Sequence, residues 1–186
     1  MPTTIRSKVP ATPAMPEGAP ETLHYAIAPC SLGLLVMATS AHGICALLFA
    51  DDEPSLLEEL QSRFPNASLH RDQARLQDQL DAVLAYLRAP VRRPDLPLDM
   101  RGSAFQQRVW QALLDIPAGH TVRYSELAAR LGSHARAVAG ACARNPIGLL
   151  VPCHRVTGAN QSLTGYRWGL ERKAALLAAE RQAVGA

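Results

Sequence analysis

Apolar residues at the start of the chain occur in short separate runs. Three runs, around residues 24–27, 34–38 and 44–49, are divided by Gly33 and Gly43. Short apolar runs bounded by glycine are typical of strands that are joined by tight turns. The pattern therefore predicts a small antiparallel sheet at the beginning of the folded chain.

The apolar spacing then becomes helical. Pro54 stands at a first-turn position behind three acidic residues, and the leucines that follow it continue a helical period to about Phe64. A second helix is expected from about Asp72 to Arg88, where one apolar stripe consists of Leu76, Leu80, Val83, Leu84 and Leu87. Residues 22–89 are thus expected to form an α/β domain, a small antiparallel sheet plus helices.

Prolines separate this region from the rest of the chain on both sides. Pro90, Pro94 and Pro97 predict an extended linker over residues 90–101. Five further prolines and almost no large apolar residues occupy the first twenty positions. Such a segment cannot bury enough surface to order itself, so residues 1–21 are expected to be a disordered, Pro-rich tail without an assigned function.

Helical spacing returns after the linker. Ser103 and Gln106 form a capping box ahead of an apolar helix face. A short helix over about residues 125–131, a turn at Gly132 and a second helix over about residues 135–143 make a helix-turn-helix candidate. Residues 102–186 are therefore expected to form a mostly α-helical domain.

The second helix of this candidate pair consists almost entirely of small residues behind Arg136. A thin helix lets its backbone approach a neighbour closely. That neighbour is either another part of the protein or a narrow nucleic-acid groove, and the pattern leaves both open.

Charge divides the chain more clearly than the net charge of +3 suggests. Residues 1–100 contain 8 Lys and Arg against 12 Asp and Glu, whereas residues 101–186 contain 11 against 4, and ten of those eleven are Arg. An Arg-rich half suits a polyanionic partner such as nucleic acid. An ordinary solvated basic face fits the charge equally well.

The composition is that of a globular protein, with 48% hydrophobic and 19% charged residues among 186. The sequence has no apolar run long enough to cross a bilayer and no signal-peptide pattern, so a cytoplasmic protein without membrane contact is expected. The four cysteines have no C-x-x-C spacing, and free thiols are expected.

One short segment carries the chemistry, because Cys153 lies directly beside His154 and Arg155. Neighbouring His and Arg lower the pKa of a cysteine, and the thiolate is its reactive form. Pro152 ends an apolar run, so Cys153 is expected on a turn that presents its sulfur. The competing interpretation is a buried structural cysteine beside a surface histidine, since a catalytic pair needs partners elsewhere in the chain.

Candidate partners are found among residues that also form a family pattern. They are Tyr124, Arg136, Asn145, the run from Pro152 to Val156, Gly165-Tyr166 and Glu180. Together these residues resemble the O6-alkylguanine-DNA alkyltransferases, also called methylated-DNA–protein-cysteine methyltransferases, of the Ogt and Ada C-terminal type. The resemblance covers roughly residues 22–182. It implies a ribonuclease-H-like N-terminal domain and a winged-helix-like C-terminal domain with the helix-turn-helix.

The resemblance implies DNA repair by direct reversal of damage, in which an alkyl group passes once and irreversibly from O6-alkylguanine to the protein. Cys153 would be the acceptor, His154 the base acting through a water, and Glu180 the residue that orients the base. Tyr124 would donate a hydrogen bond or proton to the departing guanine, and Asn145 would tie the DNA-reading helix to the active site. Whether O4-alkylthymine is also a substrate is left open.

The same resemblance assigns the binding residues. The carbonyl of Val156 would accept from the exocyclic amine of the base, and Tyr166 and Arg167 would wall the pocket. Arg136 would fill the gap left by the flipped base. The DNA-binding residues that it implies are Arg136, Ala137, Val138, Ala139, Gly140, Arg144 and Arg155. The partner would be double-stranded DNA containing O6-alkylguanine, bound by a monomer without a cofactor.

Two departures from the family pattern affect these expectations. Between Gly132 and Arg136 the chain is two residues shorter, so either the turn is tighter or the second helix begins later. The zinc ligands that some members carry are not reproduced, because the His and Cys residues of the first half do not align with them. No metal site is therefore expected.

Two other functions compete with repair. A non-catalytic alkyltransferase-like protein would bind lesions, but such proteins usually lack the acceptor cysteine that is present here. A cysteine hydrolase would use Cys153 and His154, although adjacent residues in an extended turn rarely point at each other. Multiple turnover of an ester or peptide would indicate the hydrolase.

Overall fold

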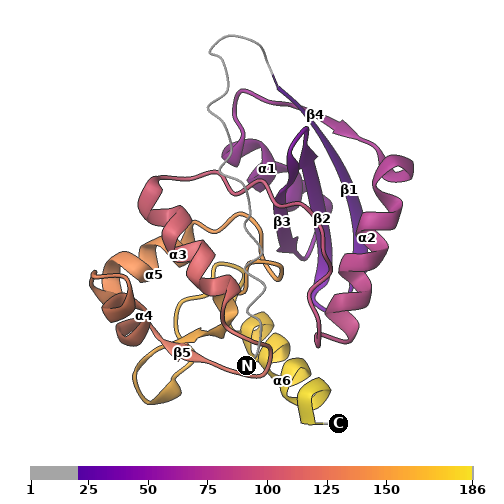
Figure 1. The fold of residues 1–186 in the computed structure, drawn as a ribbon. Helices are drawn as coiled ribbons and strands as arrows, with labels where there is room; N and C mark the ends of the chain where they lie inside the picture. Colours follow the sequence, from indigo (N-terminus) through magenta and orange to yellow (C-terminus); the bar gives the residue numbers. More distant parts are fainter. Residues whose placement is uncertain (1–20, 186) are drawn as a thin grey trace, which may run out of the picture.

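The computed structural model describes residues 21–185, which form two parts that pack side by side (Figure 1). The expected tail thus lies outside the described residues, apart from Glu21. The first part is a sheet with two helices, and the second is mostly helical. A single hydrophobic core runs through both parts, from Leu23 in the first strand to Leu176 in the last helix.

The sheet has four strands in the order β3-β2-β1-β4. β1 (Thr22–Cys30), β2 (Gly33–Ser40) and β3 (Gly43–Ala50) pair antiparallel, which confirms the three strands expected from the apolar runs. Gly33 and Gly43 have φ angles of 103° and 141°, which glycine adopts without the steric cost of a side chain. The turns therefore lie where the sequence predicted them.

The fourth strand corrects the expectation of a purely antiparallel sheet. β4 (Ser68–Arg71) runs parallel to β1. Backbone bonds hold it at both ends, from Ser68 N to Glu21 O at 2.7 Å and from Asp72 N to Tyr25 O at 2.9 Å. The strand carries one large apolar side chain, Leu69, so its sequence has no alternation that could reveal it.

Two helices pack on this sheet, as expected from their apolar stripes. α1 (Glu53–Arg63) contacts β2 and β3, and α2 (Gln73–Arg88) contacts β1 (Figure 1). Each begins with a capping aspartate: Asp52 accepts from Ser55 N at 2.8 Å, and Asp72 accepts from Arg75 N at 3.2 Å. These bonds satisfy amide groups that have no partner within the helix.

The linker is not a free spacer, because it lies against the edge of β3. Ile44 N donates to Pro97 O at 2.9 Å, and Asp99 N donates to Ile44 O at 2.8 Å. Asp99 is buried and accepts from Ser40 and Arg101. The extended conformation expected for residues 90–101 is thus fixed by the sheet.

The second part contains four α-helices within the described range. They are α3 (Ala104–Leu114), α4 (Tyr124–Arg130), α5 (Ala135–Ala143) and α6 (Leu170–Gly185). Ser103 and Gln106 form the predicted capping box of α3. Two short strands, β5 (Val122–Arg123) and β6 (Val156–Thr157), pair in parallel, and two 3-10 turns, η1 (Cys153–Arg155) and η2 (Ala159–Gln161), precede α6.

Across residues 21–185, no helix combines the length and the apolar character that a membrane span requires.

The shortened segment between α4 and α5 forms a tight turn. Gly132 has a φ of 62°, and His134 caps α5 by accepting from Ala137 N at 3.3 Å. α5 therefore begins directly after His134, and Arg136 lies in its first turn. Of the two outcomes expected from the missing residues, the structure has the tighter turn.

The two parts meet along the same edge of β3. Leu47 N donates to Pro146 O at 2.8 Å, and Gly148 N donates to Leu47 O at 2.9 Å. A Cβ atom on Gly148 would lie 2.7 Å from the Trp168 ring and 3.0 Å from Leu47 O, so this close approach requires glycine. Strand β3 thus fixes the segment that leads into Cys153.

Candidate functional site

Cys153 lies at the start of η1 and is buried, with 4% of its surface exposed. The expectation that the turn presents its sulfur is therefore wrong. After Pro152 the chain coils into a 3-10 turn, with Cys153 N donating to Val151 O at 2.8 Å, instead of continuing outward. A reacting group must consequently enter the protein to reach the sulfur.

Asn145, just beyond the end of α5, fixes the position of this turn. Its Nδ2 donates to Val151 O at 2.8 Å and to Cys153 Sγ at 3.2 Å, and its Oδ1 accepts from Ile147 N at 3.0 Å. The side chain is 1% exposed, so these bonds satisfy a buried amide. Asn145 thus connects α5 directly to the sulfur.

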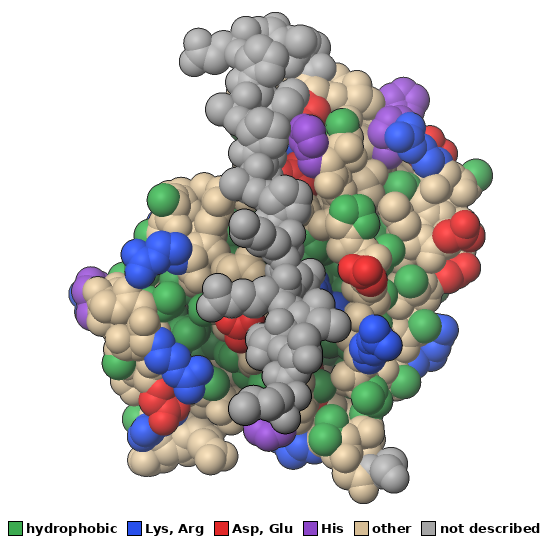
Figure 2. Space-filling model, viewed as in Figure 1, with side chains coloured by type: hydrophobic (Ala, Val, Ile, Leu, Met, Phe, Trp, Pro, Cys, Tyr) green, Lys and Arg blue, Asp and Glu red, His purple; other side chains and the backbone are tan. Residues whose placement is uncertain are grey.

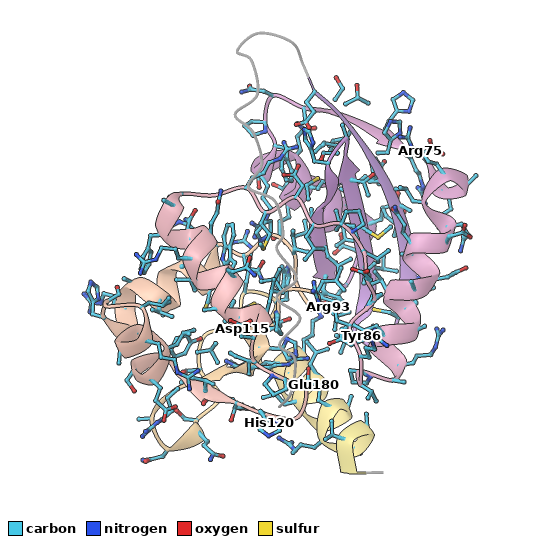
Figure 3. The ribbon with its side chains drawn as sticks, viewed as in Figure 1. Arg75, Tyr86, Arg93, Asp115, His120 and Glu180 are labelled. Atoms are coloured by element: carbon cyan, nitrogen blue, oxygen red, sulfur yellow. The ribbon has the colours of Figure 1, made fainter. Side chains whose placement is uncertain are left out.

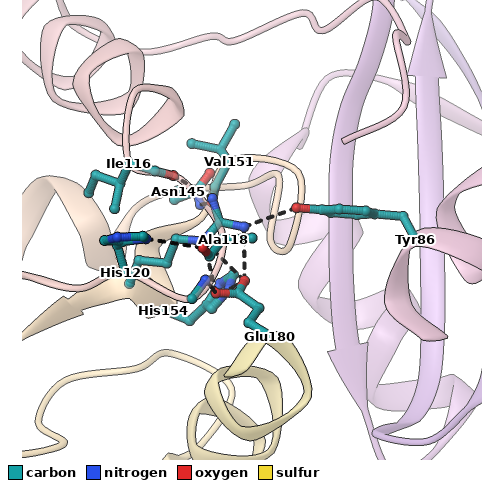
Figure 4. A network of polar contacts seen from close by, with 10 residues as sticks. Tyr86, Ile116, Ala118, His120, Asn145, Val151, His154 and Glu180 are labelled. Atoms are coloured by element: carbon teal, nitrogen blue, oxygen red, sulfur yellow. Dashed lines mark hydrogen bonds and ion pairs between the residues drawn. The ribbon is translucent and has the colours of Figure 1, made fainter. Parts of the chain in front are cut away.

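His154 and Glu180 form a buried pair, with 2.6 Å between His154 Nε2 and Glu180 Oε1 (Figure 4). Burial lowers the pKa of His154, although Glu180 acts in the opposite direction. A neutral imidazole that donates Nε2–H to the carboxylate keeps a lone pair on Nδ1. Within residues 21–185, no protein group hydrogen-bonds to Nδ1, so this nitrogen is available as a base.

Glu180, on α6, accepts hydrogen bonds from Arg155 and Gly119 in addition to its contact with His154. Burial alone would raise its pKa, but the hydrogen bonds from His154 and Arg155 and the positive charge of Arg155 outweigh burial and lower the pKa to about 2. Gly119 N donates to Glu180 Oε2 at 3.1 Å. The carboxylate therefore stays ionised and holds His154 in one orientation.

Arg155 belongs to this buried network, and its assignment to the DNA surface is wrong. It is 5% exposed, and its guanidinium donates to Glu180, to Ile116 O at 2.5 Å and to Tyr86 Oη at 3.0 Å. Figure 3 shows Tyr86 on α2 and Glu180 on α6 at the junction of the two parts. Sequence reasoning could not separate a buried arginine from a surface one beside Cys153.

Burial and the neighbouring polar groups shift the pKa of the Cys153 thiol in opposite directions. Burial raises the pKa of its thiol, whereas the hydrogen bond from Asn145 and the positive charges of Lys173 and Arg63 lower it. Deprotonation in this buried site therefore depends on a nearby base and on these two cations.

Lys173 is a site residue that the sequence analysis missed. It is fully buried on α6, and its Nζ donates to Val156 O at 2.5 Å and to Thr164 O at 2.8 Å. A signal existed, because Lys173 precedes Glu180 by seven positions and so lies on the same helix face. Lys173 ties the turn after Cys153 to the loop before α6.

A cavity of about 600 Å³ opens between α5 and that loop. Its lining includes four residues of the family pattern, Tyr124, Arg136, Gly165 and Tyr166, together with Ala135, Ala139, Ala143, Thr164 and Arg167. The Tyr166 ring packs edge-on against the His154 ring, with 6.5 Å between centroids. The cavity is therefore one aromatic ring away from the buried base.

Tyr124 holds the loop side of the cavity. Its hydroxyl donates to Gly165 O at 3.0 Å, and Gly165 has a φ of 60° that allows this close approach. Burial raises the pKa of Tyr124, and the nearby Cys142 and Cys153 raise it further. The phenol therefore remains protonated and able to donate.

The residues of α5 that were expected to contact DNA differ in their exposure to solvent. Arg136 and Arg144 are exposed, and Ala137, Ala139 and Gly140 are partly exposed. Val138 has no exposed surface and packs in the core, so its assignment to the DNA surface is wrong. Figure 2 shows Lys and Arg side chains on the part of the surface where Figure 1 places α4 and α5.

Comparison with known proteins gives consistent matches. A family model described as 6-O-methylguanine DNA methyltransferase, DNA binding domain, matches residues 104–182. The bifunctional transcriptional activator/DNA repair enzyme Ada of Escherichia coli is 46% identical over 162 residues, which are 86% of this chain and 46% of Ada. The chain thus spans about half the length of that relative.

Other relatives match over most of their length. The inducible methylated-DNA–protein-cysteine methyltransferase of Bacillus subtilis is 39% identical over 143 residues, or 74% of this chain and 80% of the relative. The crystal structure of Mycobacterium tuberculosis OGT in complex with DNA has a TM-score of 0.72 at 36% identity, covering 87% of this chain and 94% of that one. The matched length includes both parts of the fold.

Proposed function

Because the chain belongs to the methylated-DNA–protein-cysteine methyltransferase family, we propose that it takes the alkyl group from O6-alkylguanine in double-stranded DNA onto Cys153. The observation that carries the proposal is that the buried His154–Glu180 pair, next to the buried Cys153, packs through His154 against Tyr166, which lines a cavity shared with α5. A sulfur that is buried, next to a base, and approached from a helix that suits DNA is arranged for a flipped-out nucleotide.

The first step removes the thiol proton. His154 Nδ1 takes this proton through a bound water, and Glu180 stabilises the imidazolium that forms. Lys173 and Arg63 favour the thiolate by their charge, while Asn145 donates to the sulfur. These contacts offset part of the cost of ionising a buried thiol, and burial still keeps the pKa of Cys153 above its ordinary value.

The second step is a displacement at carbon. The thiolate sulfur forms a bond to the alkyl carbon, the bond from that carbon to O6 breaks, and its electron pair remains on the guanine. Tyr124, which stays protonated in this site, turns its O–H from Gly165 O to N3 of the departing guanine. The product is a stable thioether on Cys153, so each protein molecule reacts once.

The cavity supplies the contacts that hold the base. The carbonyl of Val156 accepts from the exocyclic amine with its second lone pair, since Lys173 uses the first. Tyr166 and Arg167 form the opposite wall, where a backbone N–H reaches O6. The apolar ring of Tyr166 excludes water between the bound guanine and the ring of His154.

DNA is engaged through α5. Ala139 and Gly140 keep the helix thin enough for the minor groove, and Arg136 in the first turn fills the space left by the flipped nucleotide. Arg144 at the helix end and Ala137 contact the backbone. The resemblance of α4 and α5 to a helix-turn-helix, with β5 and β6 as a winged-helix-like addition, supports this mode of binding.

Several finer assignments belong to the same proposal. The strand order β3-β2-β1-β4, with β4 parallel to β1, supports a ribonuclease-H-like domain over residues 22–89. Residues 90–101 are its linker, and residues 102–186 form the DNA-binding and alkyl-acceptor domain. The protein acts as a monomer on DNA in the cytoplasm.

Intact-protein mass spectrometry tests the reaction. The protein is mixed with excess duplex that carries one O6-methylguanine, alongside Cys153→Ser and Cys30→Ser, the latter removing a different thiol. A mass gain of one methyl group in wild type and Cys30→Ser, but not in Cys153→Ser, supports the proposal. Lesion binding without a mass gain would indicate a non-catalytic sensor, and repeated turnover of an ester would indicate a hydrolase.

A further inference from the structure

Helix α1 of the sheet domain contacts the loop that walls the cavity. Arg167, which lines the cavity, donates from Nε to Glu59 Oε1 at 2.6 Å, across 108 positions in the sequence. The Glu59 side chain is 18% exposed and that of Arg167 is 41% exposed. The contact therefore lies at the rim of the cavity, where the loop meets α1.

The same carboxylate also binds a second arginine. Arg63 donates to Glu59 Oε1 from Nε and from Nη2, both at 3.2 Å, and from Nη1 to Arg144 O at 3.3 Å. Arg144 is the C-cap residue of α5, and one face of α5 forms the other side of the cavity. Glu59 and Arg63 thus connect α1 to both walls.

The end of this connection that lies on α1 is held firmly in the core. Leu56 and Leu60, on either side of Glu59 along α1, have no exposed surface and pack in the core. The loop end of the connection is held by fewer buried groups, because Thr164, Gly165 and Arg167 are exposed. If the cavity wall is displaced, the contact between Glu59 and Arg167 is therefore expected to break before α1 moves.

We propose that Glu59 and Arg63 form a latch that sets the width of the cavity, and thereby the size of the alkyl group that reacts. The inference rests on the proposed function of the cavity. A methyl group adds little to the volume of guanine and fits with the latch closed. A bulky group displaces the wall around Tyr166 and Arg167, which requires the bond from Arg167 to Glu59 to break.

The test compares two duplexes, one with O6-methylguanine and one with O6-benzylguanine, in single-turnover reactions with wild type, Glu59→Gln and Glu59→Asp. The ratio of the benzyl rate to the methyl rate is expected to rise about fivefold in both variants, the scale of a partly buried ion pair expressed as a rate. Glu58→Gln, an exposed change on the same helix, is the matched control and keeps the wild-type ratio.

The two variants separate geometry from charge. Glu59→Gln removes a negative charge near Arg63, which interacts with Cys153, and keeps the length of the side chain. Glu59→Asp keeps the charge and shortens the side chain, which breaks the 2.6 Å contact with Arg167 and weakens the two 3.2 Å contacts with Arg63. A rise in the ratio in Glu59→Gln only would overturn the latch and indicate an effect of charge.

The outcomes also separate the latch from the function on which it rests. If wild type transfers methyl to Cys153 but the ratio is unchanged in both Glu59 variants, the latch is wrong and the proposed function stands. If wild type transfers no methyl group, the proposed function fails first. Thermal unfolding of each variant checks that a changed ratio does not come from a misfolded fraction.

Discussion

Tyr86 on α2 and Arg155 in the turn after Cys153 are joined by a hydrogen bond of 3.0 Å between Tyr86 Oη and Arg155 Nη2. Both side chains are buried, and the same guanidinium holds Glu180, which in turn holds His154 (Figure 4). The orientation of the base therefore depends on a residue of the sheet domain, which carries none of the groups that react.

Tyr86→Phe is expected to slow alkyl transfer without abolishing it. Loss of the hydroxyl leaves Arg155 free to shift, and one buried hydrogen bond contributes about 1 kcal/mol, so a rate reduction of roughly threefold to tenfold is expected. Single-turnover rates on methylated duplex measure it across pH, because a displaced Glu180 also changes the pKa of His154. Tyr25→Phe, a change of the same kind in β1, should leave both rate and pH profile as in wild type.

Glu180→Gln should alter how stability depends on pH. The folded-state pKa of Glu180 is about 2, below its ordinary 4.5, so on acidification the unfolded chain binds the proton first. This contribution is complete above about pH 5 and is lost as pH falls towards 2, by roughly 3 kcal/mol in total.

Urea unfolding at several pH values between 7 and 3 checks this expectation. Wild type and the exposed control Glu171→Gln should lose stability along the same curve. Glu180→Gln should start lower, because Arg155 loses its carboxylate, and should follow a flatter curve. Parallel curves for wild type and Glu180→Gln would show that the carboxylate is not the group that titrates.

Arg136→Ala is expected to impair repair of duplex more than repair of single strands. The side chain is needed only where a flipped base leaves a gap in a stack, and flipping costs a few kcal/mol, so a tenfold or greater loss on duplex is expected. Rates on both substrates measure the difference, with Arg181→Ala on α6 as a control for charge. An equal loss on the two substrates would contradict a role in flipping.

Gly148→Ala should destabilise the fold by about 1–3 kcal/mol, because its Cβ would overlap the Trp168 ring and crowd Leu47 O. Thermal unfolding measures the loss, and the fluorescence of Trp168 reports its displacement. Gly140→Ala is the matched control, since its Cβ would come no closer than 3.5 Å to a neighbour. If both variants unfold at the wild-type temperature, the junction is looser than the structure indicates.

The elements that follow local rules were predictable from the sequence. The capping box at Ser103, the glycine turns of the sheet and the helix behind Pro54 depend on residues within a few positions of one another. For these elements the sequence contains the whole physical cause. The roles proposed for Cys153 and His154 rest on their adjacency and on the family pattern.

The features that were missed depend on distant contacts. Arg155 is buried because Tyr86, Ile116 and Glu180 surround it, and none of these lies near it in the chain. The strand β4 exists because β1 offers it an edge, and not because of its own composition. The sulfur of Cys153 is buried because the chain coils into a 3-10 turn after Pro152, and Asn145 donates to it from beyond the end of α5.

The edge of β3 receives both the linker and the segment that leads into the active site. The position of Cys153 in the folded protein therefore depends on a strand that is paired within the sheet domain. During synthesis the sheet emerges first and can serve as a template for a turn made about one hundred residues later. A chain interrupted before α6 would complete the template but lack Glu180, so His154 would have no carboxylate to orient it until the last helix docks.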